Sequence, residues 1–89
     1  MNKNLITLRR KIDTIDQVII RALAKRQGVA HAIAEEKQKV LLPVRDRVRE
    51  QELQSIRRKL ARDYGIDPAW LDKVYKLILT QSKNIQKQL

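Results

Sequence analysis

The sequence predicts an all-α fold with three helices per chain, one long N-terminal helix and two shorter ones, in an intertwined helical homodimer. Helix-forming residues dominate the composition, with two Gly and two Pro and no Phe among 89 residues. Apolar residues recur at steps of three and four, which is the spacing of a packed helix face, and no strand pattern occurs. The first helix is also too long for the rest of one chain to cover.

The long helix is predicted over residues 5–38. Its apolar face, here called the seam, follows alternating steps of three and four along Leu5, Leu8, Ile12, Ile15, Ile19 and Ala22. The same steps continue through Arg26, Val29, Ile33 and Lys37, so that two cations fall at positions of the packed face. A buried charge is costly unless something pairs with it. Either the seam ends in solvent at Arg26, or Arg26 and Lys37 face a site that holds an anion.

The length of this helix predicts a homodimer. About 34 helical residues span roughly 50 Å at 1.5 Å per residue. Gly28 is the one weak point, since Gly costs about 1 kcal/mol against Ala inside a helix. The remaining ~50 residues cannot cover such a rod from end to end, and a second copy of the chain is the expected cover.

Two further helices follow a connection predicted over residues 39–44, where Pro43 stops any preceding helix. The second helix should begin near Asp46, an N-cap or first-turn acid, and end at Gly65, which suits a left-handed closing turn. Asp67 and Pro68 predict the start of the third helix, as its cap and first residue. The apolar positions are Val48, Leu53, Ile56 and Leu60 in the second helix and Leu71, Val74, Ile78, Ile85 and Leu89 in the third.

Composition restricts the classes of function. Residues 1–89 make a single domain. The absence of Cys excludes disulfides and Cys-based metal sites, and one His cannot build a zinc site alone. No signal-peptide core and no apolar run near ~20 residues occurs, so we expect a cytoplasmic protein without a membrane partner. The formal charge of +10 favours polyanions or small anionic ligands, although a solvated basic surface accounts for most of these side chains.

The cations of the long helix form the first candidate site. Arg26 and Lys37 lie about 16 Å apart along the axis and within roughly 20° of one face, so their side chains can bracket a small dianion. Arg9 lies about 25 Å from Arg26 and points roughly 100° away. Arg9 therefore cannot serve the same ligand within one chain. In an antiparallel or crossed dimer it can reach the partner's site; the alternative is a solvated arginine.

The shorter helices carry two more polar sets. Asp46, Arg49 and Glu50 share one face, as a site wall or as a surface ion-pair ladder. Ser82 and Gln86 are also neighbours on one face, as site residues or as the polar end of an apolar stripe. No nucleophile triad, metal cluster, phosphate loop or carboxylate dyad emerges. An enzyme built from these residues would use positive charge and hydrogen-bond donors rather than a nucleophile, metal or redox cofactor.

An ordered set of motifs runs through the chain. It comprises residues 8–13 (LRRKID) with Ile15-Asp16, residues 24–26 (AKR), Lys37, residues 43–50 (PVRDRVRE), and Ser82 with Gln86. From about Leu5 to Gln88 this set resembles the all-helical class of chorismate mutases. The resemblance implies a single chorismate mutase domain in an intertwined homodimer. It also implies conversion of chorismate to prephenate, on the way to phenylalanine and tyrosine, without cofactor or metal.

The resemblance also implies a role for each matching residue. The substrate-binding residues would be Arg9 toward the partner's site, with Arg26, Lys37, Asp46, Arg49, Glu50, Ser82 and Gln86. Arg26 and Ser82 would hold carboxylates, Arg49 would support the anionic pocket, and Asp46 and Glu50 would address the ring hydroxyl. Lys37 and Gln86 would contact the ether oxygen whose C–O bond breaks. Lys37 would also contact a nearby carboxylate. Lys37, Gln86, Arg26 and Glu50 would be the catalytic residues.

Gln86 predicts a flat pH profile, because an amide donates a hydrogen bond at any pH whereas a carboxylic acid must be protonated. Little change in rate is expected from about pH 5 to 8.

Three alternatives remain. The first is an isochorismate pyruvate-lyase-like enzyme of the same fold, and the second is a structural helical dimer. The third is a basic helical module that binds nucleic acid. Two observations argue against it: the chain has no recognised nucleic-acid motif, and it has only one Trp and two Tyr for base stacking.

Overall fold

The computed structural model describes residues 2–40 and 47–88. Three α-helices make up this part of the chain, α1 (Lys3–Val40), α2 (Arg47–Asp63) and α3 (Pro68–Lys87). The all-α class with one long and two shorter helices is therefore confirmed. Two boundaries were wrong: α1 begins at Lys3 rather than at Leu5, and Lys39 and Val40 belong to α1 and not to a connection. Lys37 and Lys39 place positive charge in the last turn of α1, where it stabilises the helix dipole.

Polar side chains cap the starts of α1 and α3. The Oδ1 atom of Asn2 accepts hydrogen bonds from the backbone N–H of Asn4, at 2.8 Å, and of Leu5, at 3.2 Å. Asp67 accepts from the backbone N–H of Ala69 at 3.0 Å, and Pro68 is the first residue of α3, as expected. These caps satisfy N–H groups that have no partner inside a helix. The expected cap Asp46 lies outside the described residues.

Gly65 ends α2 as predicted. Its φ of +72° is the left-handed conformation that Gly adopts without strain. The N–H of Gly65 donates to the carbonyl of Arg62 at 3.2 Å, and that of Ile66 donates to Ala61 at 2.7 Å. This pair of bonds is a Schellman motif, which satisfies the last carbonyls of a helix. The tight turn brings α3 back beside α2.

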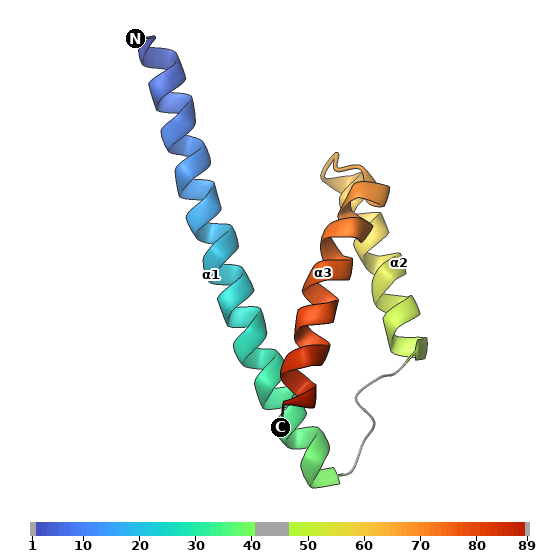
Figure 1. Cartoon of the computed structure of the whole chain (residues 1–89). Helices are drawn as coiled ribbons and strands as arrows, with labels where there is room; N and C mark the ends of the chain where they lie inside the picture. Colours follow the sequence, from blue (N-terminus) through green and yellow to red (C-terminus); the bar gives the residue numbers. More distant parts are fainter. Residues whose placement is uncertain (1, 41–46, 89) are drawn as a thin grey trace.

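The helices form a V (Figure 1). α3 packs against both other helices, with α2 on one side and the C-terminal half of α1 on the other. The N-terminal half of α1 extends away from α2 and α3, and the molecule is 58 Å long. Helix α1 continues through Gly28 without a break. Over the described residues, no helix has the length and apolar character needed to cross a membrane.

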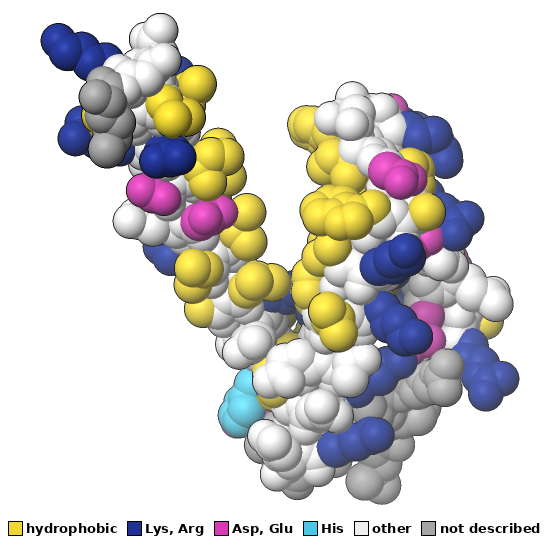
Figure 2. Space-filling model, turned by 45° about the horizontal axis from the view of Figure 1, so that its top comes forward, with side chains coloured by type: hydrophobic (Ala, Val, Ile, Leu, Met, Phe, Trp, Pro, Cys, Tyr) yellow, Lys and Arg dark blue, Asp and Glu magenta, His cyan; other side chains and the backbone are white. Residues whose placement is uncertain are grey.

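The interior of one chain is very small. Its buried residues are Ala30 and Ala34 on α1, Ala61 on α2 and Ser82 on α3. Small side chains of this kind let helix backbones approach closely. Large apolar side chains remain exposed, such as Leu8 at 56% and Ile12 at 58% on the seam. Figure 2 shows hydrophobic side chains along both inner sides of the V.

Candidate functional site

Four of the candidate site residues meet between α1 and α3. Arg26 donates a hydrogen bond from Nη1 to the hydroxyl oxygen of Ser82. Lys37 donates from Nζ to Oε1 of Gln86 at 3.4 Å. The structure thus joins both cations of the long helix to the two polar residues of α3. We call these four residues the α1–α3 pocket.

The two cations of the pocket lean toward each other. Arg26 and Lys37 leave α1 about 16 Å apart along its axis. Their partners Ser82 and Gln86 lie only about 6 Å apart along α3, one turn of helix. Two long side chains that start far apart therefore end close together. This is the convergence that a small ligand with two carboxylates requires.

Arg26 has no counter-charge among the residues that the structure describes. Its side chain is partly buried, and it forms no ion pair with residues 2–40 or 47–88. Ser82, 8% exposed, accepts from Arg26 and donates to the carbonyl of Ile78 at 3.1 Å. Because its own hydrogen is committed to Ile78, the hydroxyl presents a lone pair to the guanidinium. The arginine is thereby oriented without being neutralised, which favours an anion beside it.

Helix α2 carries two further candidate residues, Arg49 and Glu50. Glu50 forms an ion pair with Lys83 of α3, with 3.2 Å between Oε1 and Nζ. Arg49 pairs with Glu52 one turn along α2 at 3.8 Å, on an exposed surface. Glu52 is not a member of the Asp46, Arg49 and Glu50 set that the sequence suggested. Asp46, the third member of this set, lies outside the described residues.

Arg9 stays away from the pocket within one chain. It is exposed on the free N-terminal half of α1, while the pocket lies at the C-terminal half.

Lys83 is the site residue that sequence reasoning missed. It directly follows Ser82, so about 100° of helix rotation turns it from α1 toward α2 and Glu50. The sequence alone does not indicate that Lys83 meets Glu50, because this depends on where α2 packs against α3.

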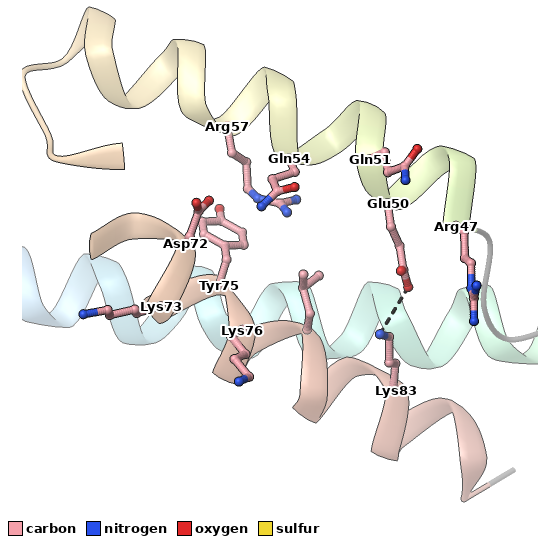
Figure 3. A pocket seen from close by; sticks show the side chains of 11 residues that line it. Arg47, Glu50, Gln51, Gln54, Arg57, Asp72, Lys73, Tyr75, Lys76 and Lys83 are labelled. Atoms are coloured by element: carbon pink, nitrogen blue, oxygen red, sulfur yellow. Dashed lines mark ion pairs between the residues drawn. The ribbon is translucent and has the colours of Figure 1, made fainter. Parts of the chain in front are cut away.

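A hollow lies between α2 and α3, on a different face of α3 from the residues that meet α1 (Figure 3). This α2–α3 groove has a volume of about 600 Å³ and is lined by polar and charged side chains. Asp72 at its edge accepts from Nη2 of Arg58 at 2.7 Å and from Nε at 2.9 Å. This hydrogen bonding, and then the charge of Asp72, raises the pKa of the Arg58 guanidinium above its usual value. Over the residues that the structure describes, no group of three or more His, Cys, Asp or Glu is arranged to hold a metal ion.

Comparison with known protein families supports a functional role for the residues of the α1–α3 pocket. The family model described as chorismate mutase type II matches residues 8–87. The chain belongs to the type II chorismate mutase family. The match includes both helices of the α1–α3 pocket and all eight candidate site residues.

Individual relatives support this assignment. A chorismate mutase of Methanocaldococcus jannaschii is 32% identical over 88 residues, covering 99% of this chain and 89% of the relative. A bifunctional chorismate mutase/prephenate dehydratase of Buchnera aphidicola subsp. Schizaphis graminum is 33% identical, and the match covers 97% of this chain but 22% of that protein. Among solved structures, a conserved hypothetical protein from Pyrococcus furiosus has a TM-score of 0.72 and 34% identity, over 97% of this chain and 99% of the other.

Proposed function

We propose that the chain acts as a chorismate mutase, an isomerase that converts chorismate to prephenate in the α1–α3 pocket. The observation that carries this proposal is the pairing of Arg26 with Ser82 and of Lys37 with Gln86. The membership of the chain in the type II family supports the same reaction. The expected place of this reaction is the cytoplasm, in the biosynthesis of phenylalanine and tyrosine.

The reaction suits a pocket of cations and neutral donors. It is an intramolecular rearrangement that breaks a C–O ether bond while a C–C bond forms, without proton transfer or a covalent intermediate. The enzyme must hold the substrate folded, with the reacting ends together. It must also stabilise the negative charge that grows on the ether oxygen. Positioning and charge stabilisation are the two tasks that the pocket residues can perform.

Arg26 and Ser82 would perform the positioning. A carboxylate of chorismate would bind the oriented Arg26 guanidinium, whose charge has no acid partner within the described residues. Lys37 and Gln86 would act on the ether oxygen. Both would interact more strongly with the transition state than with the substrate, because the oxygen becomes more negative as the bond breaks.

The α2 residues would close the far side of the site. Arg49 would add to the positive field, and Asp46 and Glu50 would receive the ring hydroxyl. Glu50 has Lys83 beside it at 3.2 Å, which keeps positive charge next to this carboxylate. A carboxylate accepts a hydrogen bond from a hydroxyl more strongly than a neutral acid does.

The active form would be an intertwined homodimer. The seam of α1 is exposed, and so are Trp70 at 56% and Leu77 at 75% on α3. Hydrophobic side chains line both inner sides of the V (Figure 2). An apolar surface of this extent is typical of a protein interface. The α1 helix of a second copy would fill the V and carry its own Arg9 toward the first chain's pocket. Each site would then contain residues of both chains.

The experiment that tests this function is turnover of chorismate, followed by loss of its ultraviolet absorbance with the product identified. Prephenate is the expected product. Lys37→Ala should lower kcat about 10²–10³-fold, the usual loss for a donor to a developing oxyanion. Lys39→Ala is the matched control, because Lys39 lies on the same helix but is exposed and pairs with Glu36 at 3.0 Å.

Each alternative function predicts a different result. Pyruvate release from isochorismate without turnover of chorismate would identify the lyase. If neither substrate reacts, a nucleic-acid titration at several salt concentrations would test the basic surface, since such binding weakens steeply with salt. Prephenate formation that is equal in Lys37→Ala and the wild type would contradict the proposed site but not the reaction.

A further inference from the structure

The α2–α3 groove contains more positive charge than the described part of the chain neutralises. Two acids line it, and both are engaged: Asp72 with Arg58 and Glu50 with Lys83. Four further lining residues are cations, namely Arg47 and Arg57 of α2 and Lys73 and Lys76 of α3. None of these four forms an ion pair with another residue that the structure describes. The groove therefore carries a surplus of uncompensated positive charge from two facing helices.

Arg57 is the fixed element of this groove. Its guanidinium lies over the ring of Tyr75, 4.6 Å from the centroid, and this stacking holds its plane. Its Nε atom is buried and has no hydrogen-bond acceptor among the described residues. An arginine is normally held this firmly by a carboxylate, but here an aromatic ring does so. A guanidinium that is ordered yet not neutralised is prepared to bind an oxyanion.

The groove is distinct from the α1–α3 pocket, although Glu50 at its edge is also the proposed partner of the substrate's ring hydroxyl. Along α3, Ile78, Ser82 and Gln86 follow steps of four residues on the side that meets α1. Tyr75, Leu79 and Lys83 follow the same steps one residue out of phase, on the side that meets α2. The two rows differ by about 100° around the helix, since each residue turns by that angle. A ligand of the groove contacts Arg57 without contacting Arg26.

We propose that the α2–α3 groove is a second anion-binding site, which takes a small oxyanion with at least two negative charges. Arg57 binds the anion through its guanidinium, and Lys73 and Lys76, which line the same groove on α3, add positive charge beside it. A phosphate ester or a polycarboxylate has this chemistry. The volume of about 600 Å³ is enough for a metabolite of either kind.

The test is isothermal titration calorimetry of the whole protein with pyrophosphate and, separately, with citrate at constant ionic strength. Saturable binding of one anion per chain is expected. Arg57→Gln should weaken it by about tenfold or more, because a charge-assisted hydrogen bond is lost. Lys11→Gln is the control, since it removes one positive charge from an exposed position of α1, and it should change the affinity less than about twofold. Arg26→Gln should bind as well as the wild type.

Circular dichroism would show whether Arg57→Gln still folds. A second variant keeps the test valid if it does not. Lys76 is exposed, and Lys76→Gln should weaken binding more than Lys11→Gln does. Binding of both probes supports a general oxyanion site, and binding of pyrophosphate alone supports a phosphate site. Absence of saturable binding overturns the proposal. Equal losses in the groove variants and Lys11→Gln overturn it as well, because they indicate attraction to net charge. Loss of binding in Arg26→Gln instead assigns the anion to the substrate pocket.

Discussion

Lys37 and Gln86 are joined across α1 and α3 by a hydrogen bond of 3.4 Å from Nζ to Oε1. The amide oxygen of Gln86 faces the ammonium group, so the amide NH₂ group is directed elsewhere and can donate. Two donors of different chemistry thus lie side by side in the α1–α3 pocket. Neither requires a proton from solvent in order to donate near neutral pH.

This pair predicts activity that is nearly independent of pH. From about pH 5 to 8 the amide of Gln86 does not titrate, so it can donate a hydrogen bond throughout this range. Arg58, whose pKa is raised by Asp72, also keeps its charge over this range and adds no pH dependence of folding stability. The measurement is kcat/KM for chorismate against pH. A steep change within this range would contradict the placement of Gln86 at the ether oxygen.

Gln86→Glu should restrict activity to acid pH. The new carboxyl group can donate only when protonated, and the adjacent Lys37 ammonium lowers its pKa by favouring the charged form. Activity should therefore fall as the pH rises through that pKa, and it should be low at pH 7. Gln81→Glu is the matched control, because Gln81 is exposed on the same helix and gains the same charge. Equal pH profiles for the two variants would remove Gln86 from the reaction.

Ser82→Ala should impair substrate binding without loss of stability. It removes the hydroxyl that orients Arg26, so kcat/KM should fall about 10- to 100-fold, mainly through KM. Ala is a better helix former than Ser, which offsets the lost bond to Ile78. The control is Thr80→Ala, which removes a similar bond, 2.7 Å to Lys76, from an exposed position. A loss of thermal stability in Ser82→Ala that matches its loss of activity would indicate a structural role only.

Arg9 should act in the site of the partner chain. Arg9→Ala and Arg26→Ala should each be nearly inactive alone. When the two variants are unfolded together and refolded as an equal mixture, half of the dimers contain one chain of each. One of the two sites in such a dimer then has both arginines, so about a quarter of the wild-type activity should return. No recovery, with mixed dimers shown by mass spectrometry, would place Arg9 outside the partner's site.

Ile12→Asp should break the dimer. Ile12 is 58% exposed on the seam in the single chain, and an interface would bury the new charge at high cost. Light scattering should show half the wild-type mass, and chorismate turnover should be lost. Thr14→Asp provides the control, because Thr14 lies about 200° around α1 from Ile12, away from the seam. A dimer of normal mass in Ile12→Asp would mean that another surface joins the chains.

The sequence determined the local features of the fold. Asp67, Pro68 and Gly65 fix where helices begin and end through hydrogen bonds and backbone angles within a few residues. The boundary after Gln38 could not be placed in the same way: α1 continues to Val40, and the first helix breaker after Gln38 in the sequence is Pro43. Motifs in the correct order also identified the family, which the match over residues 8–87 confirms.

The tertiary structure decided which residues meet. Spacing along a helix gives neighbours three or four residues apart, but Arg26 and Ser82 are 56 residues apart and meet only because α3 crosses α1 at small side chains. The side of α3 that faces α2 likewise determines that Lys83 meets Glu50 and that Arg57 lies over Tyr75. Helix packing angles depend on the shapes of entire surfaces, and no local pattern of residues contains that information.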